Sequence, residues 1–433
     1  MQALRKPGTF VIKAAFLLAL IAAIVWNVRF GIADLLARRN QPDRTRVAMQ
    51  IMPANAAYPA QLADEIYATD PASALSLLQR SVKLNPNSAQ AWIQLGLLHE
   101  EKNDLQQAQS ALLRAANVDA TFLPSWSLAN FYFRQGNVSD FWSWAQKAAE
   151  MDPDNATPLF RLAWYTSPNA GEIEERLKIQ KPLIEIQLVN FLMSQGNPGA
   201  VSETGAHLLA MAKGDYVETV LSACEWLIEN KRADLALPLW DGLAERGKIA
   251  YSVVTEDSPD TVTNGDFNQS PISRGFDWHM LSPKGVSPFL NSDPNALGFE
   301  FSGDEPESFV VMFQTAPVRP LSQYTLEVDY STSGLLSGSG IEWLIADAQS
   351  ESALAETGSL SAEKDGKAYA CFTAPVGAKF VNLKLQYQRR PGTVLVEGRI
   401  AIRKIALTKG TAEECKNGPS FASGAIRHSE GGD

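Results

Sequence analysis

The pattern of apolar and polar residues changes twice along this chain and predicts three kinds of structure. An uncharged run from Ala14 to Val28 is apolar apart from Asn27. From about Tyr58 to residue 250, apolar residues recur at the spacing of one helix face. Near Tyr251 the period becomes two, as in half-buried β-strands. The chain is therefore predicted to be multidomain, with helices first and strands afterwards.

The N-terminal run is long enough to be a transmembrane helix. Extended back through residues 9–12 it reaches about 20 residues, provided that Lys13 snorkels. Basic residues flank it on both sides, so charge alone leaves its orientation open. Because no clean cleavage site follows the run, we expect residues 1–37 to be an uncleaved signal anchor and the rest of the chain to be exported, periplasmic or otherwise extracytoplasmic. A cleaved signal peptide and a buried core helix are the alternatives.

Residues 38–54 are polar and interrupted by Pro42 and Pro53, which predicts a linker between the membrane and the first folded domain. Several arginines lie just after the apolar run, among them Arg44 and Arg46. They are candidate contacts for anionic lipid headgroups. A solvated basic stretch without a partner is the alternative.

The helical region contains an internal repeat of 34 residues. Trp92 and Trp126 stand one period apart, and three further pairs keep the same spacing: Asn103 and Asn137, Ala111 and Ala145, and Ala115 and Ala149. The segment from Trp92 to Gly96 fits the W-x2-L-G opening of tetratricopeptide repeats, so the region resembles that family. The resemblance implies an α-solenoid of stacked helical hairpins, in which the two tryptophans are packing residues.

The resemblance covers residues 55–171. The repeats are expected near 55–88, 89–122 and 123–155, with a weaker fourth from Thr157. Residues 172–250 keep the helical spacing but lose the 34-residue register, and predict degenerate hairpins that cap the solenoid.

Tetratricopeptide arrays present a concave groove lined by the first helix of each hairpin, and the resemblance implies a peptide or protein partner there. The positions of this sequence that match the groove are Gln90, Ile93, Leu97, Glu100, Glu101, Ser127, Phe131 and Arg134. For Ile93, Leu97 and Phe131 a second interpretation stays open, because the same spacing suits packing against a neighbouring helix.

Residues 258–408 predict an antiparallel β-sandwich of the size of one jelly roll. Strands are expected at residues 309–313, 324–330, 341–345, 381–387 and 394–402, separated by glycine-containing turns. Tyr330 and Trp343 share the parity of neighbouring aliphatic residues, which favours the inner face.

The segments from Asn264 to Phe267 and from Gly275 to Trp278 resemble the opening of carbohydrate-binding-module-like, galactose-binding-type jelly rolls. The resemblance implies that glycans are held by aromatic faces beside hydrogen-bonding side chains. The candidate residues are Trp278, Tyr387, Arg389 and Arg390. For Arg389 and Arg390, an acidic partner and ordinary solvated charge are the alternatives.

The same resemblance implies a structural calcium near the first strand, for which Asp266 and Asp277 are conceivable ligands. Two carboxylates are too few for a calcium site, so solvated turn residues are the favoured interpretation.

Composition narrows the function. The net charge of −10 and pI near 5.1 argue against nucleic acid as a partner. The four histidines are scattered, and no hydrolase, metalloprotease, P-loop or dinucleotide-binding motif is present. We therefore expect no enzymatic activity, no catalytic residue and no cofactor.

Cysteine usage adds one hypothesis. Cys371 and Cys415 are candidates for a disulfide that fastens the tail to the sandwich in an oxidising compartment. Cys224, among apolar neighbours, is expected to be a buried helix residue. Residues 409–433 are rich in Gly, Ser and Glu and predict a disordered tail.

Together these features predict a non-enzymatic, membrane-anchored scaffold whose repeats bind protein and whose sandwich binds glycan, in surface polysaccharide assembly or export. A purely protein-binding assembly factor is the first alternative. A glycoside-active enzyme is a more remote one, since it requires two carboxylates about 5 to 10 Å apart in a cleft.

Overall fold

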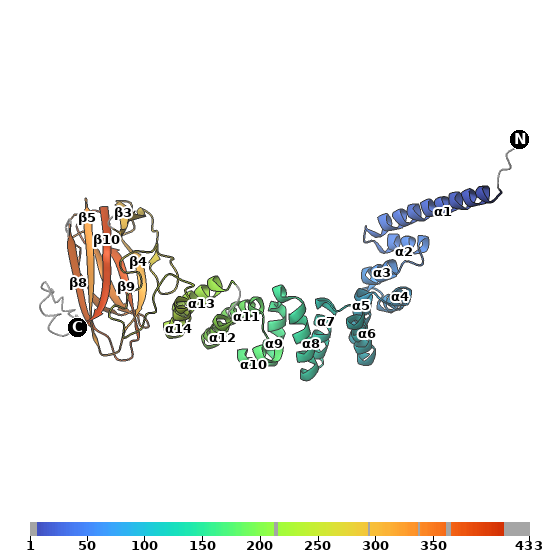
Figure 1. Cartoon of the computed structure of the whole chain (residues 1–433), viewed down its shortest axis with the longest axis horizontal. Coiled ribbons are helices and arrows are strands. Elements are labelled where there is room, and N and C mark those ends of the chain that lie inside the picture. The colour runs from blue at the N-terminus through green and yellow to red at the C-terminus, as the bar shows by residue number, and fades with distance from the viewer. Residues whose placement is uncertain (1–6, 212–214, 293–294, 337, 361–364, 411–433) are drawn as a thin grey trace, which may run out of the picture. The chain divides into compact units, whose positions relative to one another are not determined.

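A computed structural model describes residues 7–211, 215–292, 295–336, 338–360 and 365–410 (Figure 1). The chain divides into two compact units, one ending at Ile179 and the other beginning at Gln180. Helices precede strands, and the strands form two antiparallel sheets, so the predicted order of α-solenoid and β-sandwich is confirmed.

The first unit begins with helix α1 (Pro7–Ala37). Its stretch from Ile12 to Ala37 has a mean hydropathy of 2.0 and is the one helix among the described residues that is long and apolar enough to cross a membrane. None of its most apolar window is buried within the protein. Length and composition thus agree with a spanning helix.

The linker expected at residues 38–54 is wrong for most of its length, because helix α2 (Pro42–Ile51) occupies it. Pro42 stands in the first turn of α2, where its missing N–H costs no hydrogen bond and its fixed φ suits a helix start. Ala48 and Met52 are buried against neighbouring helices. Proline here starts a helix instead of interrupting one.

Eight further helices pair into hairpins to complete the first unit. They are α3 (Ala57–Ile66), α4 (Pro71–Leu84), α5 (Ala89–Glu101), α6 (Leu105–Val118), α7 (Phe122–Arg134), α8 (Val138–Met151), α9 (Thr157–Thr166) and α10 (Ala170–Leu177). Side chains cap several N-termini; the carboxylate of Asp104, for example, accepts from the Gln107 N–H.

Small residues set how closely the paired helices approach. A Cβ added at Gly96 of α5 would lie 2.7 Å from Leu112 Cγ and 3.2 Å from the Ala108 carbonyl oxygen of α6. Trp92 is partly buried and donates from Nε1 to the Pro86 carbonyl at 2.8 Å. Trp126 is also partly buried and stacks on Phe122. The repeat-marking residues therefore serve packing within the array.

The second unit combines four helices with the two sheets. The helices are α11 (Pro182–Ser194), α12 (Pro198–Ala210), α13 (Val217–Glu229) and α14 (Ala233–Glu245). The strands are β1 (His279–Met280), β2 (Val286–Ser292), β3 (Asn295–Ser302), β4 (Ser308–Pro317), β5 (Gln323–Ser333), β6 (Ile341–Asp347), β7 (Ala353–Glu356), β8 (Gly366–Thr373), β9 (Phe380–Gln388) and β10 (Glu397–Lys409).

One sheet has the order β1-β4-β9-β6-β7 and the other β2-β3-β10-β5-β8. All pairings are antiparallel within the described residues. Strand β10 starts at Glu397, three residues later than the start expected at Val394, and continues to Lys409. Tyr330 and Trp343 lie in the core between the sheets, as their parity predicts.

A buried junction joins the last helical hairpin to the sandwich. The Glu225 carboxylate of α13 accepts a hydrogen bond from the Gly275 N–H at 2.9 Å and contacts His279 Nε2 at 2.8 Å. Gly275 has a φ of +58° and lies against the indole of Trp240, so a side chain at this position would collide with the ring. Trp240 also stacks on Tyr251, with ring centroids 5.4 Å apart.

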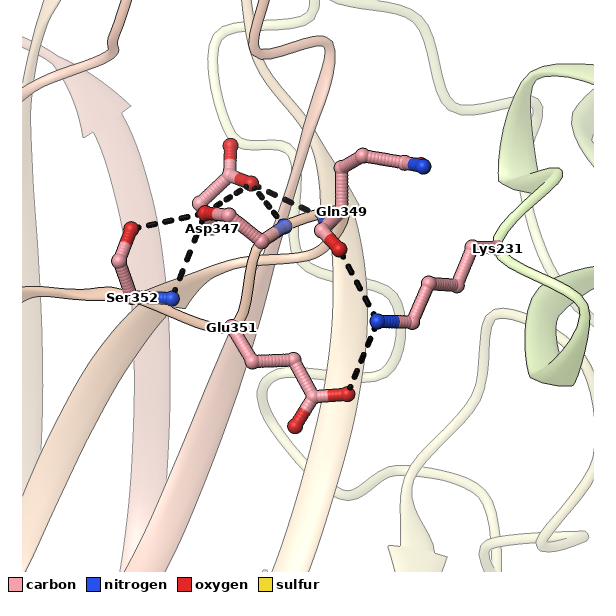
Figure 2. A network of polar contacts seen from close by, with 6 residues as sticks. Lys231, Asp347, Gln349, Glu351 and Ser352 are labelled. Carbon is pink, nitrogen blue, oxygen red and sulfur yellow. Dashed lines mark hydrogen bonds and ion pairs between the residues drawn. The ribbon is translucent and has the colours of Figure 1, made fainter.

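A second contact between these parts is polar and exposed (Figure 2). Lys231 Nζ, at the turn between α13 and α14, donates to the Gln349 carbonyl at 3.0 Å and lies 3.5 Å from Glu351. Asp347 holds the receiving turn in shape, since its Oδ1 accepts from the backbone N–H groups of Gln349 and Ser350. Within the second unit, the hairpin of α13 and α14 therefore contacts the sandwich at two defined places.

Candidate functional site

A pocket on the helical array and a cleft on the sandwich are the candidate binding sites among the described residues. The first is a pocket of about 240 Å³ between α3, α4 and α5. It is lined by Ala63, Asp64, Tyr67, Ala74, Leu78, Gln94, Leu97 and Leu98. Leu97 is 44 % exposed and Tyr67 41 % exposed, so two large side chains frame an open apolar depression.

Contacts at one repeat period connect neighbouring helices beside this pocket. The hydroxyl of Tyr67, the residue that follows α3, donates to the Glu101 carboxylate of α5. Arg134 of α7 forms a bidentate pair with Glu100 of α5, with Nε–Oε1 at 2.8 Å and Nη2–Oε2 at 2.7 Å. The hydrogen bond to Glu101 raises the pKa of Tyr67 above its ordinary value. The pocket is thus apolar in its walls and acidic at its rim.

The predicted groove residues divide into two groups. Gln90, Leu97, Glu101 and Arg134 are exposed, and Glu100 is partly exposed. Ile93, Ser127 and Phe131 are buried, so they pack between helices and are not available to a partner in this conformation. The packing interpretation therefore holds for Ile93 and Phe131 but not for Leu97.

Asp64 and Tyr67 were not among the candidates from the sequence. Both belong to the first expected repeat, residues 55–88. A signal was nevertheless present, because Tyr67 stands 34 residues before Glu101. Subtracting one repeat of 34 residues from the groove position Glu101 gives Tyr67.

The second surface is a cleft of about 1080 Å³ at one end of the sandwich. Its lining is rich in glycine and hydroxyl groups: Gly285, Ser287, Glu300, Phe301, Ser302, Ser333, Gly334, Leu336, Gly338, Ser339, Gly392, Thr393, Val394, Leu395, Val396, Glu397, Gly398 and Arg399. Arg399 Nη2 lies 2.8 Å from Glu300 Oε1 across the β3–β10 pair. The cleft therefore offers hydroxyls, carboxylates and a guanidinium group.

A smaller hollow of about 390 Å³ adjoins the cleft on the outer face of the β2-β3-β10-β5-β8 sheet. The two share Glu300, Ser333 and Arg399. The hollow adds the half-buried ring of Phe289, which covers Gly298 so closely that a Cβ at Gly298 would overlap it. We refer to the cleft and the hollow together as the sandwich cleft.

The aromatic glycan candidates from the sequence do not lie in this cleft. Trp278 and Tyr387 are both 0 % exposed and belong to the core between the sheets. Trp278 packs edge to face on Trp343, and its Nε1 donates to the Asn264 carbonyl at 3.2 Å. Both candidates are corrected to core residues. The sequence contained a signal for Tyr387, because it alternates in register with Leu383 and Leu385 and therefore shares their buried face of β9.

Arg389 and Arg390 lie beyond β9, and both have acidic neighbours. Arg389 Nη1 pairs with Glu307 at 2.6 Å, and its Nε donates to the carbonyl of Thr393, a residue of the cleft lining. Arg390 lies 3.8 Å from Glu342. The structure thus places Arg389 beside the cleft as a support for its wall.

The calcium candidates Asp266 and Asp277 do not form a shared site in the described residues. Asp277 is fully buried, and its carboxylate accepts from the Tyr251 hydroxyl at 2.8 Å and the Ile272 N–H at 2.6 Å. Burial raises the pKa of Asp277, and these donors oppose the shift. Asp266 is exposed, and its carboxylate accepts a hydrogen bond from the Asn268 side-chain amide. No third ligating side chain among the described residues joins the two aspartates.

Cys415 lies outside the described residues, so its pairing with Cys371 stays a prediction. Cys224 is a free, fully buried cysteine of α13, as its apolar neighbours predict. Burial raises the pKa of its thiol well above the ordinary value, which keeps the thiol protonated at neutral pH. Cys224 is therefore a packing residue.

Comparison with known proteins supports the repeats. Residues 63–124 match a family model described as tetratricopeptide repeat, a range that includes Trp92 and all of the pocket lining. No curated protein matches the chain. The repeats imply a protein-interaction scaffold.

Among solved structures the likenesses are distant. A crystal structure of MamA is 17% identical and covers 36% of this chain and 88% of its own, with a TM-score of 0.30. YrrB, described as a TPR protein with an unusual peptide-binding site, is 12% identical, with a TM-score of 0.26, and the match covers 48% of this chain and 95% of YrrB. A structure described as "CBM4 structure and function" is 10% identical and covers 34% and 99%, with a TM-score of 0.28.

Proposed function

We propose that this protein is a non-enzymatic, membrane-anchored scaffold that brings a protein partner and a glycan together in the assembly or export of a surface polysaccharide. The observation that supports the proposal is the presence of two separate hollows, the α3–α5 pocket and the sandwich cleft. The apolar helix α1 supplies the anchor, with the rest of the chain on the extracytoplasmic side.

The pocket between α3 and α5 suits one aliphatic side chain of a partner peptide. Its volume of about 240 Å³ and its leucine and alanine walls match such a group. Asp64 lines the pocket and Glu101 lies beside it, so a lysine or arginine next to the aliphatic residue would find an opposite charge. The partner is therefore a peptide segment that combines an aliphatic and a basic residue.

The sandwich cleft suits a glycan. Sugars are bound by hydroxyl, carboxylate and guanidinium groups that exchange hydrogen bonds with their hydroxyls. Ser331, Glu300 and Arg399 lie on one hollow with the partly exposed ring of Phe289, which offers an apolar face. Phe289 takes the role that the sequence analysis gave to Trp278 and Tyr387.

A glycan array probed with the full-length protein in a non-ionic detergent tests the glycan half. We expect the wild type to bind a glycan and the double variant F289A/R399A to lose this binding. R319A should retain it, since Arg319 is partly exposed and ion-paired but lines neither part of the cleft. Absence of binding to any glycan would favour the purely protein-binding alternative. Release of sugar from a bound glycan would refute the non-enzymatic assignment.

Photo-crosslinking tests the protein half. A crosslinkable residue at Leu97 should capture a partner in cells, whereas one at Leu84, similarly exposed at the end of α4, should not. Equal capture from both positions would contradict a partner site at the α3–α5 pocket.

A further inference from the structure

The last turns of helix α1 belong to the folded array. Ala33 and Ala37 are buried in a small core with Ala48, Met52 and Tyr58. One uninterrupted helix therefore contains both the apolar span and part of the packed array.

Polar contacts fix helix α2 beside these turns. Arg29 Nη2 donates to the carbonyl oxygen of Ile51, the last residue of α2, at 2.7 Å. Helix C-termini carry a partial negative charge, so the Arg29 guanidinium is partly neutralised there. Gln61 of α3 donates to the Ala37 carbonyl at 2.6 Å. Helix α2 thus runs back along α1 from the level of Ala37 to that of Arg29.

The opposite side of α1 stays apolar past Arg29. By helical spacing, Val28, Ile32 and Leu35 lie across the helix from Ala33 and Ala37. Ile32 is 49 % exposed and Leu35 65 % exposed. A bilayer that contacts this side reaches the level of α2, which brings the turn between α1 and α2 to the depth of the lipid headgroups.

Four arginines gather at that turn: Arg38, Arg39, Arg44 and Arg46. Arg38 pairs with Asp34 at 2.8 Å and Arg46 with Asp43 at 2.9 Å. Arg39 is exposed and Arg44 is partly exposed, and neither has an ion pair within the part of the chain that the structure describes. Residues 1–50 contain eight basic residues, counting Lys and Arg together, and two Asp, so their net charge is +6. The whole chain has a net charge of −10, so the remaining residues carry −16.

We propose that the turn between α1 and α2 is a binding surface for anionic phospholipid headgroups, with Arg39 and Arg44 as the principal contacts and Ile32 and Leu35 against the acyl chains. The inference rests on the proposed membrane anchor. Charge complementarity favours this occupant, because basic residues gather beside the apolar span of an acidic chain. Headgroup binding holds the array at a fixed angle to the membrane, since α1 enters the array without a flexible linker.

The test uses the full-length protein in a non-ionic detergent, titrated with short-chain phosphatidylglycerol or short-chain phosphatidylcholine. We expect phosphatidylglycerol to bind more tightly, and its binding to weaken as salt is raised. R39E/R44E should weaken it by at least roughly 30-fold, on the order of fivefold or more for each arginine. The matched control K83E/R114E makes the same change in net charge at exposed positions of α4 and α6 and should leave binding unchanged.

Equal affinity for the two lipids, or an equal loss in the control variant, would overturn the proposal. Circular dichroism of each variant establishes that it is folded. Alkaline extraction of cell membranes tests the anchor separately: release of the chain as a soluble protein refutes the anchor, whereas retention of a chain that does not discriminate between the lipids refutes only the headgroup surface.

Discussion

Replacing Gly275 by alanine tests whether the junction between α13–α14 and the sandwich depends on close contact with Trp240. Gly275 has a φ of +58°, and an added Cβ would lie 2.7 Å from Trp240 Cε3 and 2.8 Å from Cζ3. The left-handed backbone costs a residue with a side chain about 1 to 2 kcal/mol. Displacing the buried indole adds about 1 to 3 kcal/mol, the usual range for overpacking. We expect G275A to destabilise the junction by about 2 to 5 kcal/mol.

The matched control is Gly247→Ala, at the end of α14. Gly247 has a φ of +61°, and no atom lies within 4 Å of an added Cβ. The two variants therefore share the backbone cost and differ only in the clash with Trp240. Hydrogen exchange of the full-length protein, followed by mass spectrometry in peptides from α13 and α14, reports the local free energy of opening. A difference between the variants below about 0.5 kcal/mol would refute the reasoning, because the added Cβ at Gly275 would then cause no overpacking against Trp240.

Three further predictions concern the junction, the array and the core. Burial raises the pKa of Glu225, but its bonds to His279 and Gly275 and the charge of Arg274 outweigh this and leave the pKa below its ordinary value of 4.5. The stability that Glu225 contributes is therefore present above pH 4.5 and lost as the pH falls through its folded-state pKa. The free energy of opening of α13, taken from exchange rates corrected for the slower intrinsic exchange at low pH, should fall on acidification in the wild type and depend less on pH in E225Q. Gly96→Ala, whose Cβ would lie 2.7 Å from Leu112 Cγ, should lower the free energy of unfolding of the array by about 1 to 3 kcal/mol, measured by hydrogen exchange in α5 and α6 as urea is raised. An unchanged free energy would contradict the close packing of these two helices. Trp278→Ala should lower the free energy of opening of the sandwich strands, measured by hydrogen exchange, by about 3 to 5 kcal/mol. If Trp278 were a surface contact for sugar, this free energy would not change.

Much of the fold could be predicted from local pattern. The 34-residue period identified the array, and the change to period two identified the sandwich, because each reflects which side of an element is buried. Parity placed Tyr330 and Trp343 correctly in the core. The linker at residues 38–54 was wrong because prolines were taken as interruptions, although proline in the first turn of a helix is compatible with it.

The candidate sites were harder to predict. Leu97 and Arg134 were placed on an exposed side of the array, since the family pattern transfers position by position. Trp278 and Tyr387 were chosen for their chemistry, and chemistry does not distinguish a ring that stacks on a sugar from one that packs in the core against Trp343 or Phe309. Phe289 was missed because its exposure depends on the glycine opposite it on β3.

The sequence by itself determined the order of the structural classes, the repeat length and the apolar span, because these depend on spacing along the chain. Only the tertiary structure decided which side chains meet. Glu300 and Arg399 lie on strands and are 99 residues apart in the sequence. Glu225 of helix α13 contacts His279 of strand β1, which stands 54 residues later. Such contacts depend on strand register and helix packing, which no local period encodes. The same reason holds at the membrane, where the packing of Ala33 and Ala37 turned an expected tether into the first hairpin of the array.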